Sequence, residues 1–115
     1  MQFTLPFPPS VNARYKMQRG RRSKGDKVIA WIDAATSKLN EDCIPPFEGR
    51  CSLIYELYHP DERIRDDSNY AKYLTDLLVQ HGILKDDCRR YVKSTTTIWA
   101  DKPGGYVVIK IIPVD

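Results

Sequence analysis

Residues 51–59 read Cys-Ser-Leu-Ile-Tyr-Glu-Leu-Tyr-His, and residues 68–81 read Ser-Asn-Tyr-Ala-Lys-Tyr-Leu-Thr-Asp-Leu-Leu-Val-Gln-His. The first segment is rich in β-forming residues and places apolar side chains at every second position, which predicts a strand ending at Pro60. In the second segment apolar residues recur at helical spacing, which predicts an amphipathic helix that Gly82 stops. The apolar positions of this helix are Tyr70, Tyr73, Leu74, Leu77 and Leu78.

The flanking segments are interpreted in the same way. Residues 3–5 alternate apolar and polar side chains before three closely spaced prolines, which predicts a short strand. Residues 27–40 predict a helix that Asp26 is suited to cap. Residues 91–99 and 106–112 predict two strands joined by a hairpin loop over 101–105. Residues 10–26 show no periodicity, and we expect a long loop there. The apolar positions of the helix over 27–40 are Val28, Trp31, Ile32, Ala35 and Leu39.

The predicted order is therefore strand, helix, strand, helix, strand, strand. Two helices packed on a small mixed β-sheet are the economical way to bury these apolar faces, so the predicted class is α+β. A chain of 115 residues is long enough for one hydrophobic core, and we expect a single domain over residues 1–115.

Composition excludes several classes of protein. No apolar run approaches the roughly 20 residues that a membrane-spanning helix needs, and the first residues do not resemble a signal peptide. The three cysteines show no paired spacing, which favours a reducing compartment over a disulfide framework. The two histidines, His59 and His81, lie far from any cysteine motif, so a zinc site is not expected. We expect a cytoplasmic protein without a membrane partner.

Positive charge is concentrated near the N-terminus. The segment from Arg14 to Lys27 holds seven cationic residues and one acid, although the net charge of the whole chain is only +3. Such a segment is suited to bind the phosphates of a nucleic acid, although a solvated loop has the same composition. The residues expected to contact nucleic acid are Arg14, Lys16, Arg19, Arg21, Arg22 and Lys24.

Two pairs of carboxylates flank the helix over 68–81. Asp66 and Asp67 precede it, and Asp86 and Asp87 follow it, at the start of the next strand. If that strand returned its first residues to the end of the sheet near Asp66, the acids would cluster and could hold Mg²⁺ for phosphate chemistry, with Lys72 stabilising the developing charge. The alternative is that these acids only cap the helix and form a solvated turn.

Together these features resemble the RusA family of Holliday-junction resolvases. Residues 5–15, Leu-Pro-Phe-Pro-Pro-Ser-Val-Asn-Ala-Arg-Tyr, are similar to the opening strand and the Pro-Pro-Ser-x-Asn-x-x-Tyr signature of the family. Residues 60–87 are similar to its central signature, in which a basic loop leads to Arg-Asp-x-Asp-Asn, a helix with a lysine, and then Gly, two apolar residues and an Asp-Asp pair. The resemblance covers nearly the whole chain, with matching spacing between the motifs.

The resemblance assigns roles to individual residues. Asp66 matches the first catalytic aspartate and Asp87 the last, and both would hold the metal. Asn69 matches the asparagine that orders the site, and Lys72 matches the catalytic lysine of the helix. Arg65 matches a basic residue that approaches the DNA.

One position departs from the family pattern. Ser68 stands where the second catalytic aspartate is expected. Either Asp67 replaces that aspartate as a ligand, or Ser68 supplies a neutral oxygen, or the site is weakened. Whether Asp67 or Asp86 completes the coordination shell also stays open.

The resemblance implies a Mg²⁺-dependent endonuclease, with Mn²⁺ as a substitute metal, that resolves four-way junction DNA by paired nicks during recombination and repair. It also implies a homodimer in a bacterial or phage-infected cell. A different hypothesis is a protein that binds branched DNA with little or no cleavage, because Ser68 has blunted the site. A third is a small RNA-binding protein whose acid pairs are only caps and turns.

Overall fold

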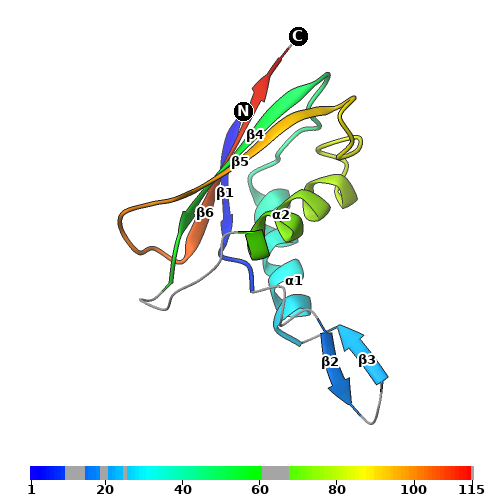
Figure 1. Ribbon diagram of the computed structural model, residues 1–115, viewed down its shortest axis with the longest axis vertical. Helices are drawn as coiled ribbons and strands as arrows, with labels where there is room; N and C mark the ends of the chain where they lie inside the picture. The colour runs from blue at the N-terminus through cyan, green and yellow to red at the C-terminus, as the bar shows by residue number, and fades with distance from the viewer. Residues whose placement is uncertain (10–14, 19–20, 25, 61–67, 115) are drawn as a thin grey trace.

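The structure is a computed structural model that describes residues 1–9, 15–18, 21–24, 26–60 and 68–114; for residues 15–18, 21–24, 68 and 69 it describes only the path of the backbone. Six strands and two helices occur in this part of the chain (Figure 1). In chain order they are β1 Gln2–Pro6, β2 Tyr15–Gln18, β3 Arg21–Lys24, α1 Asp26–Glu41, β4 Cys51–Tyr58, α2 Ser68–Gln80, β5 Val92–Trp99 and β6 Tyr106–Pro113.

Four of the strands form one mixed sheet in the order β1-β6-β4-β5. β4 and β5 run parallel and are joined through α2, whereas β6 is antiparallel to both β4 and β1. The connection through α2 is the crossover that a parallel pair requires, because a tight turn cannot join strands that run in the same direction. The expected α+β class and the two helices on a mixed sheet are confirmed.

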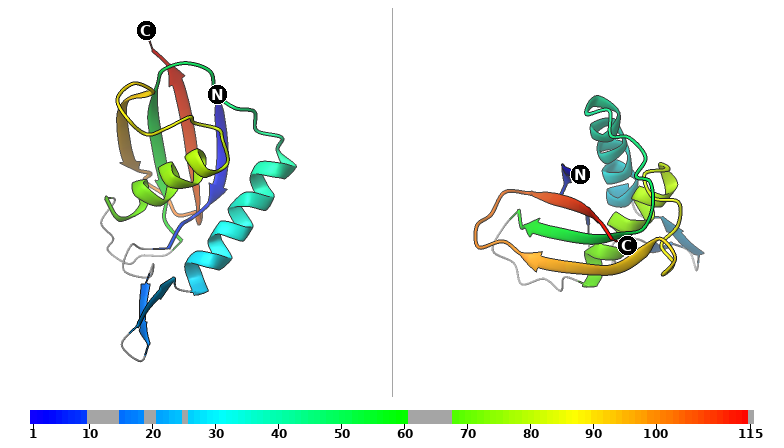
Figure 2. Two further views of the ribbon diagram at one scale, coloured as in Figure 1. Left: turned by 90° about the vertical axis from the view of Figure 1, so that its right-hand side faces the viewer. Right: turned by 90° about the horizontal axis from the view of Figure 1, so that it is seen from above.

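Both helices cover the same face of this sheet, and the opposite face carries no helix (Figure 2). Alternate residues of the strands point to the covered face and are buried against the helices, as the period of two in a strand requires. The helical positions predicted to be apolar are buried as well, except Ile32, which is half-buried. The largest fully buried side chains are Tyr55, Leu5, Leu53, Leu57, Leu74, Leu77, Leu78, Ile109, Ile111, Val28, Val107 and Pro8.

One polar contact lies within this core, between β4 and α2. The side chain of Tyr55 is fully buried, and its hydroxyl lies 2.6 Å from the hydroxyl of Thr75. Thr75 in turn donates a hydrogen bond to the carbonyl oxygen of Ala71, at 3.0 Å. Burial raises the pKa of Tyr55, so this phenol stays neutral and the core holds no charge at this point.

Both helices end in the same backbone motif. After α2, Gly82 has a positive φ of 74°, and the amides of Gly82 and Ile83 donate to the carbonyl oxygens of Val79 and Leu78. This pattern is a Schellman motif, in which a left-handed residue satisfies the last carbonyl groups of a helix. The stop predicted at Gly82 is confirmed.

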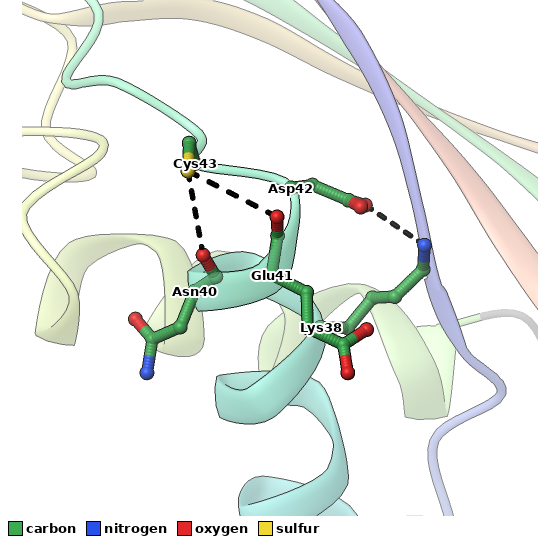
Figure 3. Close-up of polar contacts among 5 residues, drawn as sticks. All are labelled: Lys38, Asn40, Glu41, Asp42 and Cys43. Atoms are coloured by element: carbon green, nitrogen blue, oxygen red, sulfur yellow. Dashed lines mark hydrogen bonds and ion pairs between the residues drawn. The ribbon is translucent and has the colours of Figure 1, made fainter.

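After α1, the left-handed position is occupied by Cys43, with a φ of 52°. Its amide donates to Asn40, and the amide of Ile44 donates to Leu39. Its thiol lies 3.7 Å from the carbonyl oxygen of Asn40, and an ion pair of 2.9 Å joins Lys38 to Asp42 beside it (Figure 3). The hydrogen bond and the charge of Asp42 raise the pKa of Lys38.

The predicted loop over residues 10–26 is wrong for two segments. Residues 15–18 and 21–24 form the antiparallel strands β2 and β3, with Gln18 paired to Arg21. Only Arg19 and Gly20 separate the two strands. A two-residue connection containing glycine is a hairpin signal, and the density of charge in this segment concealed it.

The predicted hairpin between the last two strands is also wrong. β5 and β6 do not pair with each other, because β4 lies between them. Residues 101–105 therefore cross the end of β4 rather than forming a tight turn. The reason is that the side chains of β5 are more hydrophilic than those of β6. β5 exposes four consecutive residues, Lys93 to Thr96, and is suited to the edge of the sheet, whereas the apolar β6 is buried between β1 and β4.

Neither of the described helices is both long enough and apolar enough to cross a lipid bilayer.

The two helix ends give a matched pair of stability tests. We expect Gly82→Ala to lower the free energy of unfolding by about 1–2 kcal/mol, because a Cβ atom is disfavoured at positive φ. Cys43→Gly should raise the free energy of unfolding by about 0.5–1 kcal/mol. Glycine removes the strain at positive φ, and this gain exceeds the loss caused by the greater conformational entropy of the unfolded chain. Urea denaturation measures both changes. Equal stability of both variants and the wild type would contradict this account.

Candidate active site

The structure describes some of the predicted site residues and not others. Five of them lie outside the described residues: Arg14, Arg19, Arg65, Asp66 and Asp67. For five more the backbone alone is placed: Lys16, Arg21, Arg22, Lys24 and Asn69. Lys72 and Asp87 are described completely, and both are exposed.

A cluster of aromatic rings marks the end of the sheet at which α2 begins; we name it the Trp99 end. Leu57, near the end of β4, pairs with Trp99, the last residue of β5. The ring of Tyr70, in the first turn of α2, lies 6.0 Å from the ring of Trp99 and 5.0 Å from that of Phe7. His59 lies 6.4 Å from Trp99. The chain therefore both leaves β4 and enters α2 at the Trp99 end.

Lys72 lies near this end on the outer side of α2. Its neighbours Tyr70, Tyr73 and Leu74 are buried, whereas Lys72 is exposed, as the helical periodicity predicts. Among the described residues it has no ion-pair partner. Asp76, one turn later, is half-buried and borders a hollow between the two helices. The ammonium group of Lys72 is thus free to approach a phosphate group.

Asp87 lies at the opposite end of the sheet, which we name the Cys51 end. Five residues after Asp87, β5 begins at Val92, which pairs with Cys51, the first residue of β4. The carboxylate of Asp86 accepts a hydrogen bond of 2.7 Å from the amide of Asp87, and a turn from Cys88 to Val92 then leads into the strand.

The condition under which the acids would cluster, a return of Asp87 to the end of the sheet at which α2 begins, is therefore not met within one chain. Because β4 and β5 are parallel, β5 starts where β4 starts, and α2 runs back toward that end of the sheet between the two strands (Figure 1). The 13 residues of α2 extend about 18 Å at a rise of ~1.5 Å per residue. A signal for this arrangement was present in the sequence, since a helix between two strands predicts a parallel crossover.

The described residues form no metal site by themselves. No three His, Cys, Asp or Glu side chains within them lie close enough together to hold an ion. Asp87 and the alternative ligand Asp86 are the predicted ligands in this part of the chain, so the described residues of a single chain do not make up the expected magnesium site. A carboxylate is nevertheless the type of ligand that Mg²⁺ prefers.

The basic segment is in part an ordered hairpin. Figure 1 shows β2 and β3 beyond the first turn of α1, away from the four-stranded sheet. Lys16 lies on β2, and Arg21, Arg22 and Lys24 lie on β3. A protruding two-stranded ribbon of this charge has the dimensions and the electrostatic character to follow the backbone of a nucleic acid.

Sequence reasoning missed a group of residues at the Trp99 end. Tyr58, the last residue of β4, stacks on Tyr106, the first residue of β6, with ring centroids 4.4 Å apart. Lys102 lies over the ring of Tyr58. The wrong hairpin prediction concealed this group, because it paired β6 with β5 rather than with β4.

Comparison with known proteins adds to this geometry. The family model described as Endodeoxyribonuclease RusA matches residues 6–111. The chain is 31% identical to a crossover junction endodeoxyribonuclease of Enterobacteria phage HK97, over 99% of this chain and 95% of that protein. It is 33% identical to the protein of the same name from Enterobacteria phage 82 and 30% identical to that of Escherichia coli K12, each over 82% of both chains.

The exposure of Lys72 and Asp87 leads to a stability prediction. We expect Lys72→Ala and Asp87→Asn each to change the free energy of unfolding by less than about 0.5 kcal/mol, because neither side chain is packed in the core. Leu74→Ala, at a fully buried position of the same helix, should lower it by about 2–5 kcal/mol. Urea denaturation of the three variants measures these values. A large loss in either exposed variant would show that the side chain supports the fold.

Proposed function

Because the chain belongs to the RusA family, we propose that it is a Mg²⁺-dependent, structure-selective DNA endonuclease that resolves Holliday junctions by paired nicks in recombination and repair. The observation that carries the proposal is the match of the family model to residues 6–111, which includes both acid pairs and the helix between them. The three cysteines are free in the structure, which suits the cytoplasm of a bacterial or phage-infected cell.

We assign the residues as follows. Asp66, Asp87 and Asp67 would hold Mg²⁺, with Mn²⁺ as a substitute. When bound, the metal would supply Lewis-acid stabilisation of the phosphate oxygens and a more acidic water. Lys72 is placed to stabilise negative charge that develops on the phosphate, because its exposed ammonium group has no ion-pair partner among the described residues. Asn69, on the first turn of α2, would orient the site.

Arg65 and the basic segment would bind the DNA backbone. The cations of the β2–β3 ribbon sit on a projection that can reach an arm of the junction. Such contacts contribute affinity without sequence information, which is appropriate for an enzyme that selects a branched shape.

The topology also supports a homodimer. The start of α2 lies at the Trp99 end of the sheet and Asp87 at the Cys51 end, with the 13 residues of α2, about 18 Å in length, between them, so we do not expect one metal ion to join them within one chain. A second copy related by a two-fold axis can bring Asp87 of one chain to the start of α2 of the other. The same symmetry supplies two sites for two opposed nicks. We therefore propose that each site is completed by both copies.

The second candidate function is binding of branched DNA without efficient cleavage. Ser68, the first residue of α2, favours it, because a serine removes one negative charge from the expected ligand set. Serine is also a favoured residue at the start of a helix. The two candidates make different predictions for cleavage in the presence of metal.

The first test uses a synthetic four-way junction. We expect symmetric nicks in Mg²⁺, none in EDTA, and a loss of at least about 100-fold in rate for Asp66→Asn, because removal of one charge-stabilising group has that effect in other enzymes. Denaturing electrophoresis of end-labelled strands measures the nicks. Tight binding of the junction without nicks in Mg²⁺ or Mn²⁺ would favour the second candidate. Equal binding of duplex and branched DNA would contradict both.

The second test asks whether the site is shared. Asp87→Asn and Lys72→Ala should each be inactive alone. After subunit exchange, a mixed dimer would hold one intact site, so the mixture should regain nicking at roughly a quarter of all sites, given random pairing of two-fold dimers. The matched control mixes Asp66→Asn with Lys72→Ala, whose residues belong to the same end of α2, and should stay inactive. Recovery in neither mixture, with an active wild type, would contradict a shared site.

A further inference from the structure

Tyr58 and Tyr106 lie on the face of the sheet that no helix covers. Their neighbours Leu57 and Val107 point to the covered face and are fully buried. Because side chains alternate along a strand, the two tyrosines point to the opposite face, and both are half-exposed. A pair of aromatic rings is therefore presented to solvent at the Trp99 end.

The backbone holds this pair in place. Tyr58 and Tyr106 are register partners on β4 and β6, and their rings stack with centroids 4.4 Å apart and planes inclined by 21°. The amides of Gly104 and Gly105 donate to the carbonyl oxygens of His59 and Tyr58, at 2.9 and 2.8 Å. A Cβ atom at Gly104 would lie 2.9 Å from Cδ1 of Tyr106, so the chain passes directly against that ring. The backbone contacts on both sides of the stack therefore define its position in the absence of a ligand.

A cation accompanies the rings. Nζ of Lys102 lies 6.0 Å from the ring centroid of Tyr58, at the outer limit of a cation–π contact. Lys102 is exposed and has no carboxylate partner among the described residues, whereas Lys110 on the same face is paired with Glu56 at 3.0 Å. Neither phenol hydroxyl has a hydrogen-bond partner in the described part of the chain. Lys102 and both hydroxyls are therefore available to a ligand.

The group also lies next to the segment that carries the predicted catalytic acids. Tyr58 ends β4, and only His59 and Pro60 separate it from residues 61–67. His59 contacts Trp99, which contacts Tyr70 at the start of α2. Proteins bind single-stranded nucleic acid through exposed aromatic rings and nearby cationic side chains, because every base has a face that can stack on such a ring.

We propose that Tyr58, Tyr106 and Lys102 form a platform on which an unpaired DNA base stacks, with Lys102 contacting the adjacent phosphate. This inference rests on the proposed function, since it locates the platform beside the site of cleavage. A branched junction differs from a duplex at the point where base stacking is interrupted, and a fixed aromatic surface recognises that interruption without sequence preference. The alternative role of the pair is a cross-strand contact that only stabilises the sheet.

The test measures base stacking directly. A single-stranded thymidine oligonucleotide carrying one 2-aminopurine is titrated in EDTA, which excludes cleavage. The wild type should quench the fluorescence of 2-aminopurine, and Tyr58→Leu and Tyr106→Leu should each lose the quenching and bind about 5- to 150-fold more weakly, as expected for one lost base–aromatic stack. Tyr58→Phe should keep both the quenching and the affinity of the wild type. Tyr91→Leu, at the Cys51 end, is the matched control and should bind as the wild type does.

A lysine pair provides an independent arm in case the leucine variants fail to fold. Lys102→Ala should bind more weakly and lower the salt dependence of binding by about 0.7 in log–log slope, because one phosphate contact to a single strand is lost. Lys93→Ala, exposed on β5, is its control. Equal salt slopes and equal affinities for Lys102→Ala and Lys93→Ala would overturn the platform. Tyr58→Leu and Tyr106→Leu variants that are less stable but still quench 2-aminopurine as the wild type does would also overturn it.

The two proposals fail separately. Quenching of 2-aminopurine by a protein that never nicks a junction in Mg²⁺ supports the platform and overturns the proposed endonuclease. Nicking by a wild-type protein that quenches no better than Tyr58→Leu supports the endonuclease and overturns the platform.

Discussion

The parallel pairing of β4 with β5 determines where Lys72 and Asp87 lie relative to each other. Parallel strands cannot be joined by a tight turn, so α2 must carry the chain back along the sheet before β5 begins. This requirement places the start of α2 and Lys72 toward the Trp99 end and Asp87 at the Cys51 end. It also makes β5 an edge strand and sends the chain across the end of β4 to reach β6. The distance of Asp87 from the start of α2 is a consequence of that pairing, and the tyrosine pair follows from the place of β6 on the other side of β4.

Much of the fold could be predicted because local patterns report which face of an element is buried. The alternation in β4 and the helical spacing in α2 identified their buried residues correctly. Partners in the four-stranded sheet are distant in the sequence, and the error in that sheet arose there. Residues 101–105 contain a strong turn signal, yet a β5–β6 hairpin would have left β4, whose alternate residues are fully buried, without β6 as its second partner. The β2–β3 ribbon was missed because three of the four residues of β3 are cationic and β2 is only four residues long, so no apolar alternation marks the pair.

In the candidate site, too, local patterns predicted some features and strand pairing determined the others. The exposure of Lys72 followed from its position in the helical repeat, and the choice of Asp87 followed from its motif. Their relative positions depend on strand direction, which residue spacing alone does not report. Asp66 and Asp67 lie outside the described residues, so their part in the site stays a prediction. Tyr58 and Tyr106 are 48 positions apart in the sequence and meet only because β6 is inserted beside β4. No local pattern connects them.

The position of β1 has a consequence for how the chain folds. β1 pairs with β6 alone, and Gln2 lies opposite Lys110, which follows it by 108 positions in the sequence. During synthesis β1 therefore cannot pair until β6 has left the ribosome, and until then the apolar side chains of Phe3 and Leu5 have no neighbouring strand. Contacts of such long sequence separation slow folding. The interval before they form is the period in which the nascent chain is most exposed to aggregation and to chaperones.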